Sequence, residues 1–341
     1  EIRAVIVDEA ARSLTSTIAA NQRMTRDART RFIQSAEGAD DNAGLVSRNN
    51  VAFDVDGTFA VNDTTVSTSG EFFQQTGNYE GTQRRLFFGD FDVQHDGDTG
   101  STTATLTGRV AWEQMVSDRT MLGYFIGGEL AYSNIDGEFE GDQDRIGLTV
   151  GGYLVHQLAE QVYFDGFLTF GAGRNNLEMA NDVLALTSDY TTQTATIGAA
   201  LSGAYDYGSY ECRPELAFSY GYTWIGTVDF TGRAYGLVDN TLSLDAGDVS
   251  IANLTLRPEV VWALDGATLA ESSSRFSFAP RLICERVEAA GAVREDCGGG
   301  AEIGLTSLST DGLTEFNVRV LADRVGSSTR SGLELGIQHR F

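Results

Sequence analysis

The sequence predicts an all-β fold: a transmembrane antiparallel β-barrel of about twelve strands, with fourteen as the alternative, and an N-terminal α-helix inside the lumen. Apolar and polar residues alternate almost without a break from about residue 83 to the end, and side chains of a strand alternate between its two faces. The alternating segments are about 12 to 17 residues long, whereas strands of globular proteins average about 5 or 6. The connections between them alternate between short and long, as they do in outer-membrane barrels.

Composition agrees with long strands joined by permissive turns. The chain has 39 glycines, 3 prolines and 10% aromatic residues, with a mean hydropathy of −0.16. No run of about 18 apolar residues occurs, so the sequence contains no transmembrane helix. The formal net charge is −24 and all 24 basic residues are arginine. Such an acidic chain repels nucleic acid, so we expect no nucleic-acid partner.

Residues 1–35 form the predicted helix, because apolar residues recur every four positions from Ile2 to Ile18 and the pattern resumes from Met24 to Phe32. The second half is rich in arginine in an otherwise acidic protein, which favours a helix lying in a negatively charged lumen, where restricted water strengthens the attraction. We expect the following arginines of this pore helix to face lumen carboxylates: Arg12, Arg23, Arg26, Arg29 and Arg31.

Residues 36–82 are predicted to be a polar linker followed by a β-hairpin over about 51–75. If that hairpin joins the wall, the barrel has fourteen strands. A count of twelve, with the hairpin as a cap or extension, is the favoured interpretation. In a fourteen-stranded barrel the helix could become a periplasmic or plugging element.

Residues 83–341 form the predicted transmembrane barrel. The twelve segments expected to be strands are 83–95, 101–116, 119–135, 143–158, 160–175, 189–207, 209–226, 249–264, 272–287, 298–310, 312–325 and 329–341. The longer connections are about 136–143, 175–189, 226–249 and 285–298. One face of each strand is apolar or aromatic and should contact lipid, while the other carries charges that should face the lumen: Arg109, Glu113, Glu129, Asp165, Asp206, Arg257, Glu259, Arg275, Arg281, Arg319 and Asp323.

The final strand ends on an apolar face. That face is formed by Leu333, Leu335, Ile337, His339 and Phe341. A terminal strand with this pattern resembles the C-terminal signal of Gram-negative outer-membrane barrels, which the barrel assembly machinery is understood to read. We therefore expect an integral outer-membrane protein in contact with outer-membrane lipid, lipopolysaccharide and the barrel assembly machinery.

The residues that carry chemistry elsewhere are sparse. Cys284 and Cys297 bracket a loop and could form a disulfide, with Cys212 left as a small apolar residue. The cysteines lack zinc-site spacing. The three histidines, His95, His156 and His339, lie on separate predicted strands. We expect no enzymatic activity, no metal site and no cofactor.

The architecture resembles the translocator domain of autotransporters, the type V secretion family, over most of the chain. The stretches Arg85-Leu-Phe-Phe-Gly-Asp-Phe, Tyr153-Leu-Val, Tyr163-Phe-Asp-Gly-Phe, Arg213-Pro-Glu-Leu and Arg257-Pro-Glu-Val are similar to that family. The resemblance implies that the helix threads the pore and connects an upstream secreted passenger to the barrel.

The resemblance also implies that the barrel exports the passenger, anchors it at the cell surface, or does both. Some members cut their passenger at an asparagine near the helix, for which Asn21 and Asn49-Asn50 are the candidates here. The alternatives are an outer-membrane channel of the porin kind and a structural surface anchor with no transport role.

Overall fold

The computed structural model describes residues 2–37, 52–78, 83–98, 100–234, 237–265, 269, 272–310 and 312–340. A single helix, α1 (Ile2–Glu37), precedes a series of β-strands in the described residues. The strands are β1 (Ala52–Asn62), β2 (Thr65–Asn78), β3 (Gln83–Asp96), β4 (Thr102–Ser117), β5 (Thr120–Ile135), β6 (Glu140–Ala159), β7 (Val162–Ala180), β8 (Leu184–Gly203), β9 (Tyr205–Asp206), β10 (Tyr210–Ala234), β11 (Leu237–Ala263), β12 (Ser274–Ala289), β13 (Ala292–Leu308), β14 (Thr314–Val325) and β15 (Ser328–Arg340). Within these described residues, no helix is long and apolar enough to cross a membrane.

The strands form one closed antiparallel ring. Consecutive strands pair around the barrel, β15 pairs with β1, and β10 pairs with β11, so no gap remains in the order of strands. The short β9 continues β8 beside the start of β10 and adds no member to the ring. Closure matters because every backbone N–H and C=O at membrane depth needs a partner, and a closed ring has no unpaired edge there.

The favoured count of twelve strands is wrong, and the fourteen-strand alternative is confirmed. The two additional strands are β1 and β2, which the sequence analysis placed in a linker and hairpin. β1 pairs with β15 from Ala52↔Arg340 to Asn62↔Arg330 and with β2 along its other edge, so this hairpin closes the wall.

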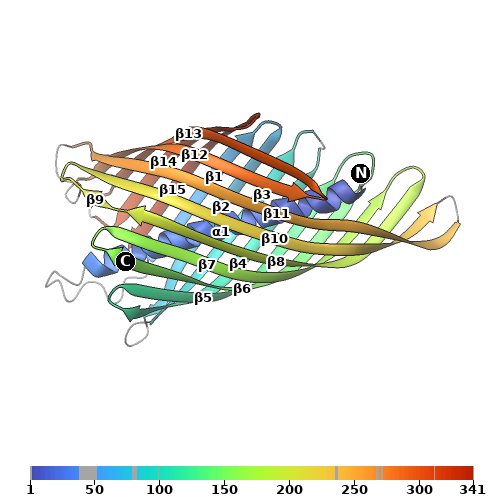
Figure 1. Cartoon of the computed structure of the whole chain (residues 1–341), viewed down its shortest axis with the longest axis horizontal. Helices are drawn as coiled ribbons and strands as arrows, with labels where there is room; N and C mark the ends of the chain where they lie inside the picture. The colour runs from blue at the N-terminus through green and yellow to red at the C-terminus, as the bar shows by residue number, and fades with distance from the viewer. Residues whose placement is uncertain are drawn as a thin grey trace.

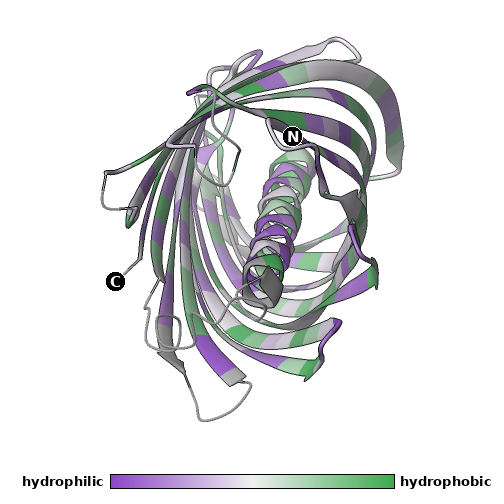
Figure 2. Cartoon of the chain, turned by 90° about the vertical axis from the view of Figure 1, so that its left-hand side faces the viewer, coloured by the Kyte–Doolittle hydropathy of each residue, from purple (hydrophilic) through white to green (hydrophobic). Residues whose placement is uncertain are grey.

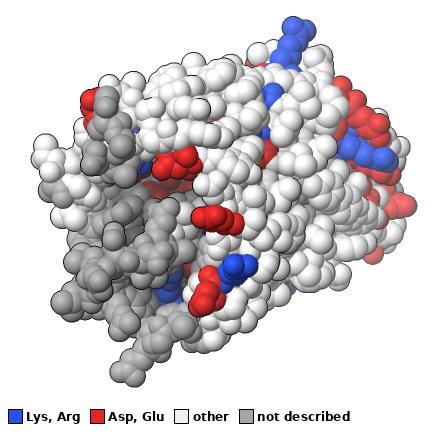
Figure 3. Space-filling model, turned by 60° about the vertical axis from the view of Figure 1, so that its left-hand side comes forward, with Lys and Arg blue, Asp and Glu red and all other residues white. Residues whose placement is uncertain are grey.

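Side chains alternate cleanly between the outside and the lumen. On β6, Leu148 is 67% exposed, whereas the arginine three positions earlier, Arg145, is only 9% exposed. The same alternation gives the barrel a half-exposed apolar outer face, including Leu106, Ile126, Phe170, Phe218 and Val320. In the view of Figure 3 most of the outer wall carries no charged side chain, and acidic residues gather toward one end. A wall of this kind suits contact with hydrocarbon.

The wall is much taller on one side than on the other. β10 and β11 have 25 and 27 residues, compared with 11 in β1. Their hairpin projects past the rest of the barrel at the right of Figure 1. We call this the hairpin end, and the opposite end, where α1 finishes, the linker end.

The long connections expected at about 175–189 and 226–249 are therefore wrong. Most of these residues continue the strands instead: Met179 pairs with Leu186, and Val228 pairs with Leu244. The predicted loop 285–298 is likewise a hairpin with a tight turn at Ala290 and Gly291, both with positive φ (53° and 82°). Positive φ at both central residues is the geometry of turns that match strand twist. In these stretches the strands stay paired although apolar and polar residues alternate less regularly, so the alternation predicted loops there.

The helix α1 runs through the barrel from the hairpin end to the linker end. Figure 2 looks into the barrel and shows α1 surrounded by the strands. Two apolar clusters pack it there, the first around Ile6, Leu14 and Ile18, and the second around Met24 and Phe32. All five of these side chains are at most 3% exposed. The helix is thus an integral part of the barrel core.

Candidate functional site: the lumen and its helix

The half of α1 near the hairpin end is held mainly by apolar contacts. Ile6, Ala10, Leu14 and Ile18 lie on one side of the helix because residues four apart are neighbours on a helix surface. They share a buried cluster with side chains of the projecting strands, namely Leu177, Met179, Leu186, Tyr190, Ile225, Val228, Phe230, Ala246, Val249 and Ile251. The tall side of the wall therefore forms an apolar collar around the first turns of α1.

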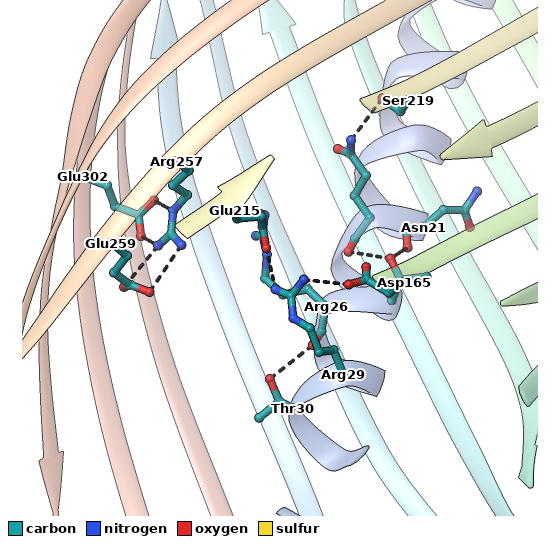
Figure 4. Close-up of polar contacts among 12 residues, drawn as sticks. Asn21, Arg26, Arg29, Thr30, Asp165, Glu215, Ser219, Arg257, Glu259 and Glu302 are labelled. Atoms are coloured by element: carbon teal, nitrogen blue, oxygen red, sulfur yellow. Dashed lines mark hydrogen bonds and ion pairs between the residues drawn. The ribbon is translucent and has the colours of Figure 1, made fainter. Parts of the chain in front are cut away.

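Polar side chains hold the middle of the helix. Asn21 is fully buried, and its Nδ2 donates to the hydroxyl oxygens of Thr196 (3.0 Å) and Thr169 (3.4 Å). Its Oδ1 accepts a hydrogen bond from Nη1 of Arg109 (3.2 Å). One residue on, Gln22 donates to Ser219 (3.0 Å), as Figure 4 shows. Because buried amides are costly when unpaired, these contacts fix the helix register against β4, β7, β8 and β10.

Within the described residues, the side-chain partners of Asn21 are two hydroxyls and a guanidinium, with no carboxylate among them. The amide nitrogen, which would have to attack the backbone in an asparagine-dependent cleavage, is directed toward two threonine hydroxyls. Asn49 and Asn50 lie outside the described residues.

Near the linker end the helix is held by ion pairs. Arg26 contacts Glu215 at 2.7 Å, and Arg29 contacts Asp165 at 2.7 Å and also Glu215. Figure 4 shows both arginines reaching from α1 to carboxylates on β7 and β10. The side chains of Arg29, Asp165 and Glu215 are at most 11% exposed. A carboxylate shared by two arginines accepts charge-assisted hydrogen bonds, the strong kind in proteins.

Two further arginines bind other parts of the wall. Arg31 contacts Glu113 of β4 at 2.6 Å, and the Tyr153 hydroxyl donates to the same carboxylate at 3.0 Å. Arg23 contacts Glu71 of β2 at 2.7 Å, with a side chain that is 40% exposed. Because their partners stand on different strands, Arg23, Arg26, Arg29 and Arg31 fix the last four turns of α1 to several sides of the wall.

Arg12 belongs to the other half of the helix. Its guanidinium lies 3.3 Å from Asp96, at the end of β3, and 3.9 Å from Glu9 on its own helix. Among the described residues, Arg12 is therefore the ion-paired arginine of α1 nearest the hairpin end.

Several predicted lumen charges pair within the wall and not with the helix. Arg257 lies between Glu259 (3.2 Å) and Glu302 (2.7 Å), a cluster visible in Figure 4. The remaining wall pairs are Glu129 with Arg145 (3.3 Å), Arg281 with Asp323 (3.1 Å), and Arg319 with Glu334 (3.5 Å). Arg275 lies on the lumen side of β12, opposite Ala263 and Thr306.

Asp206 lies at the rim of the wall. It is the exposed last residue of β9 and pairs with Glu211 of β10, and its Oδ1 accepts a hydrogen bond from the backbone N–H of Gly208 (2.7 Å). Asp and Asn commonly bond the backbone two residues on in turns. Alternation alone could not show that the wall reaches its end at this residue.

The sequence analysis missed the carboxylates that hold the helix most directly. Glu215 was noted only as part of the stretch Arg213-Pro-Glu-Leu. It lies an even number of residues from Ser219 and therefore on the same, lumen-facing side of β10. Glu71 lay in the segment assigned to a hairpin outside the wall. Arg145 and Glu302 could also have been predicted to face the lumen. Each is adjacent to a lipid-facing isoleucine, Ile146 or Ile303, and adjacent side chains on a strand point to opposite faces.

The predicted assembly residues lie on the outer face of β15. Leu333, Leu335 and Ile337 are 38%, 52% and 47% exposed. His339 continues the same face, with its Nδ1 2.8 Å from the hydroxyl of Thr314. Phe341 lies outside the described residues.

The cysteines are placed on the outer side of the wall. Cys284 and Cys297 are directly opposite each other on β12 and β13 and form a disulfide, and Cys212 is free. Across the described residues, no cluster of three or more histidine, cysteine, aspartate or glutamate side chains could hold a metal ion.

Comparisons with known proteins agree with this architecture. The model of the family described as autotransporter beta-domain matches residues 85–270, more than half of the chain. The translocator domain of the autotransporter NalP from Neisseria meningitidis is similar in structure, with 12% identity, 96% of this chain and 98% of that chain covered, and a TM-score of 0.50. The beta domain of the Bordetella autotransporter BrkA is similar at 13% identity, 86% and 99% coverage, and a TM-score of 0.50.

Another solved structure shares the barrel fold. The CymD monoaromatic hydrocarbon channel has 10% identity, 85% and 87% coverage, and a TM-score of 0.53. No curated protein sequence matches the chain. At these identities the solved structures show the fold alone, and the family model carries the assignment. The chain therefore belongs to the autotransporter beta-domain family and is an integral outer-membrane translocator barrel.

Proposed function

We propose that this barrel exports a passenger attached before residue 1 and afterwards anchors it at the cell surface, with α1 as the segment that stays in the lumen. In this proposal the hairpin end faces the exterior and the linker end faces the periplasm. The observation that supports it most is the direction of α1, which enters the lumen at the hairpin end and joins β1 from the linker end. A chain that precedes α1 would therefore leave on the side of the projecting hairpins.

The contacts of α1 support a segment that comes to rest in the lumen. Its two halves use different interactions: apolar packing in the collar, and ion pairs from Arg23 to Arg31. A helix fixed in this way blocks diffusion through the space it fills, which disfavours the open-channel alternative. In this proposal residues 1–35 are the lumen helix, 36–82 the connection and 83–341 most of the wall. The connection also contains β1 and the whole of β2, which belong to the wall.

The partners follow from the same surfaces. Lipid and the acyl chains of lipopolysaccharide would cover the apolar outer wall, and the barrel assembly machinery would engage the outer face of β15, beginning with Leu333, Leu335 and Ile337.

The experiment is surface display of a reporter fused before residue 1. In intact Gram-negative cells the reporter should be digested by added protease while a periplasmic marker survives. The matched control ends before β15 and cannot close the ring, so its reporter should stay protected. A reporter that remains protected on the intact barrel, with the barrel correctly inserted, would refute the export proposal. A structural anchor without a transport role predicts that same protected outcome.

A further inference from the structure

Part of the β11 edge has no ladder partner in the described residues. β11 pairs with β10 along its whole length but with β12 only from Val249 onward. Among the described residues, Leu237 to Asp248 therefore lack a ladder partner on the β12 side. At about 3.4 Å per residue this edge is roughly 40 Å long, measured along the strand. We call Leu237–Asp248 the free edge, and it follows the projecting hairpin at the right of Figure 1.

The central part of the free edge is regular enough to accept another strand. The β10–β11 ladder is uninterrupted from Thr227↔Asp245 to Gly232↔Asn240. Leu237–Asp248 contains no proline and no lysine, the residues that natural proteins use to blunt an edge. Irregularities in pairing occur only at the two ends, near Gly226 and Ala234.

An apolar side chain lies uncovered at this edge. Leu242 is directly opposite Phe230 on the same face of the hairpin. Phe230 is 1% exposed within the collar, whereas Leu242 is 50% exposed. A strand added along β11 would cover Leu242 and extend the collar by one strand.

The base of the free edge lies against the start of α1. Nε of Arg3 donates to the carbonyl oxygen of Ala246 at 3.2 Å. A Cβ placed on Gly247 would lie 3.1 Å from Nη2 of the same arginine. A chain that leads into Ile2 from outside therefore arrives beside the bottom of the free edge.

We propose that the passenger segment immediately before residue 1 adds to the free edge as a parallel β-strand. The inference rests on the proposed function, because it needs a passenger upstream. The strands are parallel because β11 descends toward the membrane from Leu237 to Asp248, and an incoming chain descends in the same direction toward α1. Main-chain hydrogen bonds supply the affinity in such strand addition, so the segment needs an extended backbone and an apolar residue facing Leu242 more than a fixed sequence.

Disulfide mapping in the full-length protein tests the pairing. Single cysteines replace the exposed edge residues Thr241, Ser243 and Asp245 in turn, in a Cys212→Ser background, and a second cysteine scans the upstream segment. The proposal expects cross-links within one chain. Moving the edge cysteine from Asp245 to Ser243 should shift the reactive partner by about two residues away from residue 1, and Thr241 should shift it again.

The opposite outcomes are distinct. Absence of cross-links, a shift in the other direction, or a disulfide-linked pair of barrels would overturn the parallel pairing. If the passenger of the same variants is still exposed to protease on intact cells, only this inference fails and export stands. If the passenger never reaches the surface in the unsubstituted protein, the proposed function fails instead.

Hydrogen exchange of the unsubstituted full-length protein gives an independent measurement that needs no variant to fold. Within Asn240–Asp245, the amides that point away from β10 should exchange at least about tenfold faster after surface protease removes the passenger. The β7–β8 hairpin, whose strands pair with each other up to Ala180↔Ala185, is the control and should not change. Equal exchange of the edge before and after removal would overturn the proposal.

Discussion

Glu215 is the side chain whose loss should free the helix most specifically. It accepts hydrogen bonds from both Arg26 and Arg29 and is 5% exposed. Glu215→Gln keeps the shape and removes the charge. Within the described wall, Arg26 then has no carboxylate in ion-pair contact and Arg29 keeps Asp165 alone. Removing one partner of a buried pair costs about 3–5 kcal/mol, because the other charge stays buried. The lower end of that range applies here, since the side chain of Arg26 is 43% exposed and Arg29 keeps Asp165. Release of the linker-end half of α1 relieves that cost.

The expected size of the effect follows directly. Three kcal/mol raises the population of the released helix roughly 100-fold, since each 1.4 kcal/mol is about tenfold. Trypsin reports this population because released arginines are cut, and cleavage follows the open fraction when opening is fast. In detergent micelles, trypsin should therefore cut α1 of Glu215→Gln about two orders of magnitude faster than α1 of the unsubstituted protein.

Glu259→Gln is the matched control. Glu259 is also a buried lumen glutamate, 6% exposed, but its partner Arg257 stands on the wall and keeps Glu302. This variant can lower barrel stability without releasing α1. Equal cleavage rates of α1 in the two variants would refute the claim that the Glu215 ion pairs hold the helix.

Three shorter predictions concern the wall. Gly123→Val should slow barrel assembly, because a Cβ at this position would lie 2.1 Å from an aromatic ring of β6. The control Gly108→Val should assemble normally, since no atom lies within 4 Å of a Cβ there. Assembly is measured by the heat-dependent shift in gel mobility. If both variants assemble equally, ring packing over the glycine is not required. Leu335→Arg should reduce insertion, since an arginine on the lipid face costs up to about 2–4 kcal/mol at mid-membrane, while Leu335→Val should insert normally. Equal insertion of the two variants would place this face away from lipid. Replacing Cys284 and Cys297 by serine should lower the free energy of unfolding in urea by about 3 kcal/mol and leave reporter display unchanged. A loss of display at normal barrel levels would contradict a purely stabilising role of the disulfide.

Alternation of residue type was enough to assign the faces of the wall. Leu148 and Phe170 lie outward and Glu113 and Asp165 inward because period-two patterning survives wherever one side meets lipid. The same reasoning placed arginines of the helix opposite lumen carboxylates, and two of the pairs named by residue type, Arg31 with Glu113 and Arg29 with Asp165, are in contact.

The errors arose where patterning carries little information. β1 and β2 have outward aromatics such as Phe59, yet a preceding polar linker made them resemble a detached hairpin. Strands that project beyond the membrane do not contact lipid, so they need no apolar outer face. The projecting parts of β10 and β11 therefore resembled loops in the sequence, although their backbones are paired. Alternation shows which charges face the lumen but not which of them pair. Glu215 pairs with the helix and Glu259 with Arg257 because of how α1 is placed along the wall, which the sequence does not show.

Single-channel conductance across a planar lipid bilayer tests most directly whether α1 occupies the lumen. The complete barrel is compared with one from which residues 1–35 have been deleted, at the same salt and voltage. The account predicts brief or small openings for the complete chain and a stable conductance several times larger without the helix. An equally large, stable conductance from both proteins would contradict it.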